Sequence, residues 1–496
     1  MSDLRYDIHI ASDERELVAI QDFRLAESSI TVLFGESGIG KSLSALAIAG
    51  LLDRDQLDIR LNGREYRDYL RSVELADLRK NGFFVFQEPS SHLNPLMTLR
   101  SQLREGALTK VSDEEGIVRR LWRHSPSSHV NEILSVYPKP YRPSGGEKQR
   151  ILAAMAFKKM STTPASAKGA LFIFDEPTGN LDNQLRDEFL DLLVENFRSR
   201  HCTVLLITHD YSMISRFTTS YADLAHKIYY KELGLERGRL QLREFLPSAY
   251  LGWVKAQKAH ALAERGESTL MKLQPNVRIF GRALKVTRHP AGRKPEPLSM
   301  AKGSLVYLKA PSGVGKTTLV KIMMGLLQAE ELSMVLEGVE YTQRTLRQVW
   351  STHVWGRQMA MVFQHADEAL NQNARVKDVF AGLPLKTPMN EAAITRTLSQ
   401  LFDDELDREF LRKPVKYLSG GQKQRLNLLR SMVLDTDILI LDEPLNGLDF
   451  QSSVKVLANV EDKLRRGKSV LVISHNEEIF DALTMPEDVY YLHEIT

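Results

Sequence analysis

The sequence predicts an α/β fold that occurs twice along the chain, each copy with a parallel-sheet core and a smaller helical subdomain. At 496 residues, the chain is too long for one ordinary hydrophobic core. Its strongest apolar runs, such as residues 204–207 and 438–441, are short and end in polar residues, as buried strands of a parallel sheet do. A set of motifs also recurs in the same order in both halves.

The composition is typical of a globular protein, with 43% hydrophobic and 26% charged residues. The net charge of +3 argues neither for nor against a nucleic-acid partner. Cys202 is the single cysteine, which excludes a disulfide framework, a four-cysteine zinc site and a cysteine-ligated iron–sulfur cluster. No apolar run approaches the roughly 18 residues of a membrane span, and the N-terminus lacks the apolar core of a signal peptide. We therefore expect a cytoplasmic protein that needs a partner for any work at a membrane.

Five motifs of the first half recur in the second half at a nearly constant spacing. They pair residues 35–42 with 310–317, 86–87 with 363–364, 144–150 with 419–425, 174–177 with 441–444, and 208–209 with 474–475. The spacing changes after the third motif, where the first half carries an extra polar stretch at residues 161–168 that predicts a loop. We predict one domain at residues 1–245, a linker at 246–272 and a second domain at 273–496.

Within the predicted linker, residues 255–265 favour a helix by propensity, and Gly266 follows them. Two interpretations remain open. The helix is either a spacer that lets the two halves face each other, or a surface helix of the first domain.

Each half opens with a predicted strand, a glycine-rich loop and a helix. The strands are residues 29–34 and 304–309, and the first helix is expected from Leu43 onward. In such a loop, backbone N–H groups approach phosphate oxygens closely, and the N-terminus of the helix adds partial positive charge. The loop residues expected to bind nucleotide are Gly35, Gly38, Gly40, Ser312, Gly313, Gly315 and Thr318.

Two residues at the end of each loop are expected to contact the phosphates and their metal ion. Lys41 and Lys316 would reach the β- and γ-phosphates, and the hydroxyls of Ser42 and Thr317 would bind Mg²⁺. The second loop begins with Ala310 where the first has a glycine. Alanine is tolerated there if its φ is negative, so nucleotide binding is expected in both halves.

An Asp-Glu pair follows an apolar strand in each half, at Asp175-Glu176 and Asp442-Glu443. Ligands of an open parallel sheet bind at this end of the strands. The first acid of each pair could hold Mg²⁺ through water. The second could polarise the attacking water, either as a general base or by orienting it.

The ordered set of motifs resembles the ATP-binding-cassette (ABC) superfamily over nearly all of both halves. Its most specific element is Ser-Gly-Gly-x-x-Gln-Arg, at residues 144–150 and 419–425. The resemblance implies two tandem P-loop NTPase domains of ABC type, arranged head to tail, in which this signature of one half caps the ATP bound by the other. A serine hydroxyl and glycine N–H groups at the start of a helix suit the γ-phosphate.

By this resemblance each ATP site combines residues of both halves. The first site would comprise Lys41, Ser42, Gln87, Asp175, Glu176 and His209 with Ser419, Gly420 and Gly421, and the second Lys316, Thr317, Gln364, Asp442, Glu443 and His475 with Ser144, Gly145 and Gly146. The glutamines would sense Mg²⁺ and the attacking water, and the histidines would contact the γ-phosphate. Asp182 and Asp449 match the loop through which the halves communicate. Both sites keep the glutamate and the histidine, so both are predicted to hydrolyse ATP.

The sequence departs from the family pattern at two places. Pro143 and Glu147 replace the usual leucine and glutamine of the first signature, and proline removes an N–H group, so the second site is expected to be the weaker. The aromatic residue that stacks on adenine is not evident. Tyr6, Phe280 and His289 are the available substitutes, and the adenine contacts stay unassigned.

Residues 86–98 are similar to the segment Phe-Gln-Asp-Pro-x-x-x-Leu-Asn-Pro-x-x-Thr of the oligopeptide, dipeptide and nickel importer ATPases. Residues 363–373 are a looser version, and residues 413–421 are similar to the run around their signature. The cysteine-containing extension of those ATPases is missing from residues 211–246. The resemblance implies the ATPase of an importer on the cytoplasmic face of the membrane, with two integral-membrane permeases and a substrate-binding protein. Its cargo would be a small peptide, an opine-type metallophore or a nickel chelate.

The alternative is a soluble twin-cassette ATPase that acts on ribosomes or nucleic acid. The linker is too short for the charged helical arm of translation-factor cassettes. One cysteine cannot form the cluster domain of ribosome-recycling cassettes or the zinc site of repair cassettes. The sequence therefore favours the importer.

Overall fold

A computed structural model of the chain describes residues 3–12, 15–53, 56–89, 92–105, 114–123, 126–136, 143–167, 169–179, 181–236, 239–259, 266, 268–292, 294–311, 313–402 and 406–495. The chain divides into two compact units, Met1–Pro247 and Ser248–Thr496. No helix within the described residues is long and apolar enough to cross a membrane.

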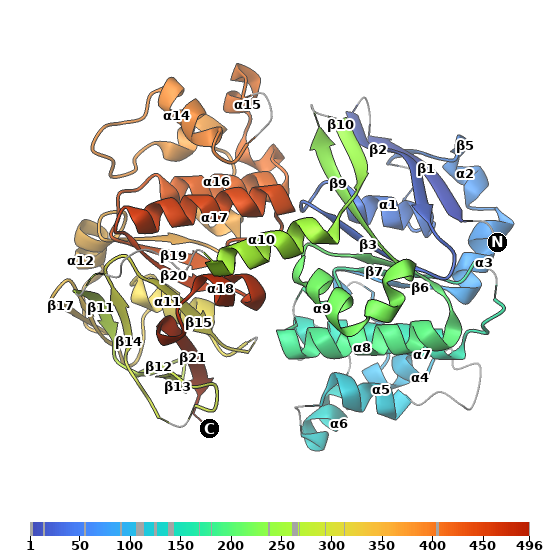
Figure 1. The fold of residues 1–496 in the computed structure, drawn as a ribbon, viewed down its shortest axis with the longest axis horizontal. Coiled ribbons are helices and arrows are strands. Elements are labelled where there is room, and N and C mark those ends of the chain that lie inside the picture. Colours follow the sequence, from blue (N-terminus) through green and yellow to red (C-terminus); the bar gives the residue numbers. More distant parts are fainter. Residues whose placement is uncertain are drawn as a thin grey trace. The chain divides into compact units, whose positions relative to one another are not determined.

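The core of the first unit is a six-stranded sheet in the order β10-β9-β3-β8-β7-β6 (Figure 1). The strands from β9 to β6 run parallel, and β10 is antiparallel to β9. These strands are β3 (Ile30–Gly35), β6 (Phe83–Val85), β7 (Leu171–Asp175), β8 (Thr203–Ile207), β9 (Ile228–Glu236) and β10 (Arg239–Glu244). Every residue of β3, β7 and β8 is buried, because helices or a second sheet cover both faces.

A second, antiparallel sheet of the first unit has the order β2-β1-β4-β5. It comprises β1 (Leu4–Ser12), β2 (Arg15–Leu25), β4 (Asp58–Leu61) and β5 (Arg64–Glu65). The apolar residues of this sheet form one core with β3, β7, β8 and the helix α1 (Lys41–Ile48). The remaining helices of the core layers are α2 (Tyr66–Tyr69), α3 (Val73–Asn81), α7 (Gly145–Thr162), α8 (Asn183–Arg200), α9 (Ser212–Ser220) and the 3₁₀ helix η2 (Ala222–Lys227).

The helical subdomain of the first unit lies between β6 and α7 in the chain. It contains α4 (Leu99–Arg104), α5 (Glu114–Leu121) and α6 (Ser127–Ser135). Of these helices, α5 contacts both α7 and α8, α4 contacts α7, and α6 contacts α4, on the side of α7 and α8 away from the sheet (Figure 1).

The second unit repeats this design with a seven-stranded sheet in the order β12-β13-β21-β15-β20-β19-β18 and an antiparallel sheet in the order β14-β11-β16-β17. The strands of the larger sheet are β12 (Asn276–Ile279), β13 (Arg282–Thr287), β15 (Leu305–Lys309), β18 (Met359–Val362), β19 (Ile438–Asp442), β20 (Ser469–Ile473) and β21 (Val489–Glu494). The smaller sheet has β11 (Thr269–Leu273), β14 (Leu298–Ala301), β16 (Ser333–Leu336) and β17 (Val339–Thr342).

The helices of the second unit follow the same plan. Around the sheet lie α11 (Lys316–Met323), α12 (Arg347–Val349), the π-helix η3 (Trp350–Val354), α16 (Gly420–Met432), α17 (Phe450–Arg465), α18 (Glu477–Leu483) and η6 (Pro486–Asp488). The helical subdomain comprises α13 (Ala366–Ala369), η4 (Val376–Phe380), α14 (Glu391–Leu398), α15 (Arg408–Arg412) and η5 (Val415–Tyr417). The predicted α/β fold with a parallel core and a helical subdomain, present twice, is confirmed.

Local boundaries differ slightly from the sequence-based expectation. The first helix begins at Lys41 rather than Leu43, because Gly40 takes a left-handed conformation and ends the loop one residue before Lys41. The stretch 161–168, expected to be a loop, begins inside α7, which continues to Thr162. Lys168 lies outside the described residues.

Of the helix expected at residues 255–265, residues 255–259 form the end of α10 (Pro247–Ala259), which packs on the second unit (Figure 1), and residues 260–265 lie outside the described residues. It begins at a proline, which suits the first turn of a helix. The ring of Tyr250 is fully buried, and its hydroxyl donates a hydrogen bond to Glu478 Oε2 at 2.9 Å. The rings of Tyr250 and Trp253 both meet Phe450 edge to face, with centroids 6.1 and 5.6 Å apart. Aromatic contacts thus fasten α10 to the start of α17.

Replacing Tyr250 is expected to destabilise the second unit. Tyr250→Ala removes a buried ring and should lower the free energy of unfolding by about 3–5 kcal/mol. Tyr250→Phe removes a hydrogen bond to a carboxylate and should cost about 1–3 kcal/mol. Urea unfolding followed by tryptophan fluorescence measures this, because Trp253, Trp350 and Trp355 all lie in the second unit. Equal midpoints for wild type and Tyr250→Ala would contradict the prediction.

Candidate nucleotide-binding sites

The first phosphate loop connects β3 to α1 and depends on glycine at its start. Gly35 has a φ of 145°, and a Cβ atom there would lie 2.4 Å from the carbonyl oxygen of Leu233. Lys41 Nζ donates hydrogen bonds to the carbonyl oxygens of Gly35 at 2.7 Å and Glu36 at 2.9 Å. The lysine ammonium group therefore lies over the loop, close to where the motif places phosphate oxygens. Gly38, also in the loop, has a φ of 82°.

The second phosphate loop connects β15 to α11 with the same geometry. Gly313 and Gly315 have φ values of 82° and 114°, close to those of Gly38 and Gly40. Lys316 Nζ donates to the carbonyl oxygen of Ala310 at 2.6 Å. Ala310 is not among the residues with positive φ, so the condition set for an alanine at this position is met. Ser312 lies outside the described residues, and Thr318 is in the first turn of α11.

The two loops give a matched pair of substitutions. Gly35→Ala is expected to weaken ATP binding by the first unit. The new methyl group would clash with the Leu233 carbonyl, and the positive φ at this position would cost an alanine roughly 1–3 kcal/mol of conformational free energy. Ala310→Gly, the reverse change in the second loop, should leave the ATP affinity within about twofold, since it introduces no clash. Binding of a fluorescent ATP analogue measures both. Equal affinities for the two variants would contradict the assignment.

Oxygen atoms suited to Mg²⁺ lie beside both loops. Ser42 Oγ donates a hydrogen bond to Asp175 Oδ1 at 3.0 Å. Burial raises the pKa of Asp175 to about 6, although the Ser42 hydroxyl opposes this shift. In the second unit, both carboxylate oxygens of Asp442 are buried. Burial likewise raises the pKa of Asp442, and the side chain of Thr317 opposes it.

This donor set fits a hydrated Mg²⁺ ion, because hydroxyl and carboxylate oxygens are the ligands that the ion prefers. A bound cation would also offset the burial of Asp175 and Asp442. Gln87 is exposed at the end of β6, and Gln364 is partly buried at the end of β18. These glutamines follow the outermost strands of the parallel cores, so their side chains can change position at little cost in packing.

The glutamate that follows each aspartate has an unusual backbone conformation. Glu176 and Glu443 have φ values of 47° and 48°, in the left-handed region that residues other than glycine rarely adopt. Their N–H groups donate to the carbonyl oxygens of Ile207 and Ile473, at the ends of the neighbouring strands. The same strain in two matching positions is typical of functional residues. The sequence motif did not reveal this feature.

In the first unit, Glu176 is paired with His209. The Nδ1 atom of His209 lies 2.9 Å from Glu176 Oε2, and the glutamate side chain is 10% exposed. Burial by itself would raise the pKa of Glu176, but the His209 imidazole outweighs it and lowers that pKa. Burial opposes the charged form of His209 too, yet the Glu176 carboxylate raises the pKa of His209. The pair therefore favours an ionised glutamate beside a protonated imidazole.

The second unit holds its glutamate differently. Ser474 Oγ and the N–H group of His475 each donate to Glu443 Oε2 at 3.1 Å. His475 Nε2 lies 3.4 Å from Glu443 Oε1. Burial raises the pKa of Glu443 to about 7, and the His475 backbone N–H opposes the shift. Sequence comparison paired Ser474 with Thr208 without giving either a role, although the hydroxyl repeated before each histidine was a usable signal.

Each signature motif begins a helix with a reciprocal cap. Ser144 Oγ accepts from the Glu147 N–H group while Glu147 Oε2 accepts from the Ser144 N–H group, and Ser419 and Gln422 do the same. Gly145 and Gly420 are the first residues of α7 and α16, and Gly146 and Gly421 follow them. The serine O–H groups still have a proton to donate, and the N-termini of the two helices add partial positive charge. Both signatures can therefore bind an anion, and Glu147 substitutes for glutamine without loss of the cap.

The suggested adenine contacts divide by exposure. Tyr6 is 1% exposed within β1 and cannot stack on a nucleotide, whereas Phe280 is 73% exposed at the tip of the β12–β13 hairpin. His289 is also exposed, two residues after the end of β13. Phe280 and His289 are therefore the accessible members of this set.

Both units thus place a glycine-rich loop and its buried lysine in the same fold position, with an Asp-Glu pair directly after a buried parallel strand. Independently, the sequence profile described as ABC transporter matches residues 19–179 and 295–446. The chain belongs to the ABC transporter family. It contains two ABC cassettes in tandem, binds ATP and is an ATPase, as proteins of this family are. The first and second units are called the first and second cassettes below.

Full-length relatives are ATP-binding proteins of transporters. The ABC transporter ATP-binding protein YejF of Escherichia coli K12, itself uncharacterized, is 26% identical over 95% of this chain and 89% of its own length. The glutathione import ATP-binding protein GsiA of Salmonella choleraesuis is 24% identical over 100% of this chain and 85% of its own length.

Solved structures confirm the twin-cassette fold. The RNase-L inhibitor superposes with a TM-score of 0.64 at 17% identity, covering 98% of this chain and 89% of that one. An archaeal ribosome recycling factor, solved with a ribosomal stalk protein, superposes with a TM-score of 0.61 at 17% identity, covering 96% and 87%. At this identity the likeness concerns the fold alone.

Proposed function

We propose that the chain is the ATPase subunit of an ABC importer for a small solute, working with two integral-membrane permeases and a substrate-binding protein. The observation that carries this proposal is its full-length similarity to GsiA, whose name states glutathione import. The importer-type segment at residues 86–98 supports it. A small peptide, the class to which glutathione belongs, is the cargo we favour over a metallophore or a nickel chelate. The chain would act at the cytoplasmic face of the membrane.

The proposed chemistry assigns one role to each group of residues. Lys41 and Lys316 bind the β- and γ-phosphates, and the backbone N–H groups of both loops bind the phosphate oxygens. Bound Mg²⁺ would neutralise the phosphate charge, held by the oxygens of Ser42 and Asp175 in one cassette and of Thr317 and Asp442 in the other. Gln87 and Gln364 would contact the metal or the water.

Hydrolysis is assigned to the glutamate–histidine pairs. Glu176 and Glu443 accept a proton from the attacking water as its oxygen bonds to the γ-phosphorus and the bond to the β-phosphate oxygen breaks. His209 and His475 orient the glutamates and contact the γ-phosphate. The signature residues Ser144, Gly145, Gly146, Ser419, Gly420 and Gly421 would bind γ-phosphate oxygens. We assign this last role from the family resemblance.

Uptake in the native host tests the proposal. A strain that lacks the gene is compared with strains carrying the wild-type chain or the Glu176→Gln, Glu443→Gln chain, with ³⁵S-labelled glutathione as the probe. The proposal predicts ATP-dependent uptake that requires the wild-type chain, with the double variant no better than the deletion. Uptake of labelled dipeptide but not glutathione would keep the importer and change the cargo. Unchanged uptake of glutathione, dipeptide and nickel would overturn the importer proposal.

A further inference from the structure

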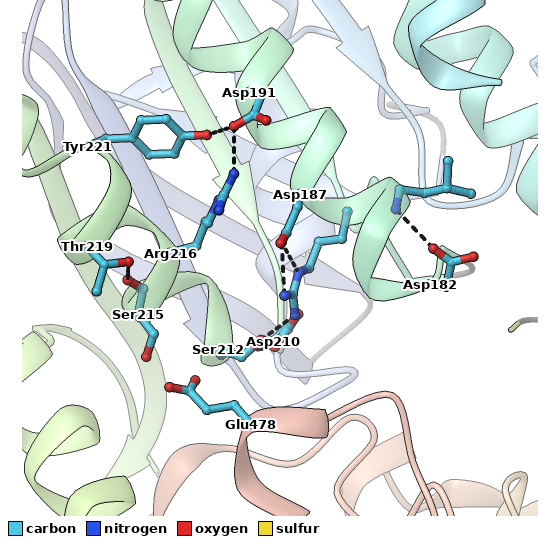
Figure 2. Close-up of polar contacts among 12 residues, drawn as sticks. Asp182, Asp187, Asp191, Asp210, Ser212, Ser215, Arg216, Thr219, Tyr221 and Glu478 are labelled. Carbon is cyan, nitrogen blue, oxygen red and sulfur yellow. Dashed lines mark hydrogen bonds and ion pairs between the residues drawn. The ribbon is translucent and has the colours of Figure 1, made fainter. Parts of the chain in front are cut away.

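A charged network in the first cassette connects the two segments that carry its proposed reacting residues. Arg186, in the first turn of α8, has Nη1 3.1 Å from Asp210 Oδ2, and the same atom donates to Ser212 Oγ at 2.6 Å. Its Nη2 donates to Asp187 Oδ1 at 3.0 Å. Figure 2 shows Asp187 and Asp210 directed at the same guanidinium group. We call these four residues the Arg186 network.

The place of this network in the fold is its most informative feature. Asp210 directly follows His209, and Arg186 follows the loop that begins at Glu176 and ends at Asp182, the N-cap of α8. The Arg186–Asp210 ion pair therefore links the segment after β7 to the segment after β8. It does so next to the Glu176–His209 contact of 2.9 Å.

The Arg186 network is well shielded from solvent. The side chains of Arg186 and Asp210 are 13% and 20% exposed. Asp210 Oδ1 also accepts from the N–H group of Ser212 at 3.0 Å, and the Asp210 N–H group donates to Thr208 Oγ1 at 3.0 Å. Shielded, charge-assisted hydrogen bonds hold geometry better than exposed ion pairs do. Asp210 thus holds the segment on both sides of His209.

The second cassette cannot form this network. The positions equivalent to Arg186 and Asp210 are Ser453 and Asn476, and neither carries a charge. Ser453 Oγ donates instead to the carbonyl oxygen of Asp449 at 2.9 Å, within its own helix. There, His475 Nε2 lies 3.4 Å from Glu443 Oε1, compared with 2.9 Å from His209 Nδ1 to Glu176 Oε2. The two cassettes thus hold equivalent pairs in different ways.

We propose that Arg186 and Asp210 are positioning residues for ATP hydrolysis at the first site, where they fix His209 against Glu176. The inference rests on the proposed roles of Glu176 and His209. Catalysis by a general base depends on a geometry held to a fraction of an ångström, so loosening this link slows the chemical step. Binding of ATP depends on the phosphate loop and stays unchanged.

A second network between the same elements provides a matched control. Asp191, farther along α8, accepts from Arg216 Nη2 of α9 at 3.0 Å and from the Tyr221 hydroxyl. Figure 2 shows Asp191, Arg216 and Tyr221 together, apart from Asp210. Asp191→Asn and Asp210→Asn each remove one ion pair with an arginine. The pair lost in Asp210→Asn lies beside His209, whereas the pair lost in Asp191→Asn joins α8 to α9 farther along both helices.

The experiment measures kcat and KM for ATP hydrolysis by the full chain. The loss of kcat in Glu176→Gln defines the turnover that depends on the first site. Asp210→Asn is expected to reduce that turnover about tenfold with KM unchanged, whereas Asp191→Asn should leave both constants unchanged. Arg186→Lys keeps the positive charge, so its kcat should fall less than that of Arg186→Ser. Serine is the residue that the second cassette has at the equivalent position, Ser453.

Each outcome decides between the proposals. If Glu176→Gln lowers kcat but Asp210→Asn does not, the positioning role is overturned and the role of Glu176 stays intact. If Asp210→Asn and Asp191→Asn lower kcat equally, the Arg186 network is a structural contact only. No loss in Glu176→Gln would overturn the proposed role of Glu176, and the inference would fall with it.

Discussion

Replacing both Glu176 and Glu443 by glutamine is expected to reduce ATP turnover by about 100- to 10,000-fold. An amide cannot accept the proton of the attacking water, so the chemical step is lost while the shape of the side chain is kept. ATP affinity should stay within about twofold, because neither glutamate belongs to a phosphate loop. Phosphate release from the purified chain measures turnover, and equilibrium binding of radiolabelled ATP measures affinity.

The single variants sharpen this prediction. Burial raises the pKa of the Glu443 carboxyl group to about 7. The pKa of Glu176 is lowered by its pairing with His209. Both single variants should lose turnover if both sites hydrolyse ATP. Glu487→Gln, in the last 3₁₀ helix of the second cassette and outside all the repeated motifs, serves as the control and should keep full activity. Full turnover in the double variant would contradict the assignment of both glutamates.

Replacing Lys41 and Lys316 by alanine is expected to abolish ATP binding at working concentrations. Each lysine ammonium group would contribute hydrogen bonds to charged phosphates worth about 1.5–3 kcal/mol, which corresponds to an affinity lower by about 10- to 150-fold at each site. Both lysines are less than a tenth exposed and bond to loop carbonyls, so the folded loops already place them. Equilibrium binding of the fluorescent ATP analogue to the Lys41→Ala, Lys316→Ala chain measures this loss of affinity.

A buried lysine elsewhere in the first cassette separates loss of binding from loss of folding. Lys158 of α7 is 3% exposed and pairs with Glu114 Oε1 at 2.5 Å. Lys158→Ala should lower the thermal stability of the first cassette but leave the ATP affinity unchanged. An equal loss of affinity in Lys158→Ala and Lys41→Ala would show that the phosphate-loop lysine acts through stability.

The sequence predicted best where chemistry and local structure depend on the same residues. The run Leu171–Asp175 is apolar because it is the buried strand β7, and it ends in the acid that lies beside Ser42. The glycines of each phosphate loop have positive φ or a close backbone neighbour, so their spacing alone predicts the loop. Because each of these residues is needed both for the backbone conformation and for the chemistry, its position in the motif predicts both.

Features that depend on contacts between distant segments were not predicted. The left-handed φ of Glu176 and Glu443 arises from hydrogen bonds to the neighbouring strand, which no local pattern reveals. The attachment of α10 depends on Tyr250 meeting Phe450, a residue far along the chain. Arg186 and Asp210 belong to no repeated motif, because the equivalent residues of the second half are Ser453 and Asn476.

The proposed importer function requires this twin ATPase to bind membrane permeases. The most direct measurement is a pull-down from detergent-solubilised membranes of the native host, with the tagged Glu176→Gln, Glu443→Gln chain as bait in the presence of ATP, analysed by mass spectrometry. The tagged Lys41→Ala, Lys316→Ala chain is the control. If the chain is an importer ATPase, two multi-span proteins will be recovered near equal stoichiometry with the bait, together with a substrate-binding protein. Recovery of the bait wholly in the soluble fraction, with ribosomal proteins or nucleic acid, would contradict it.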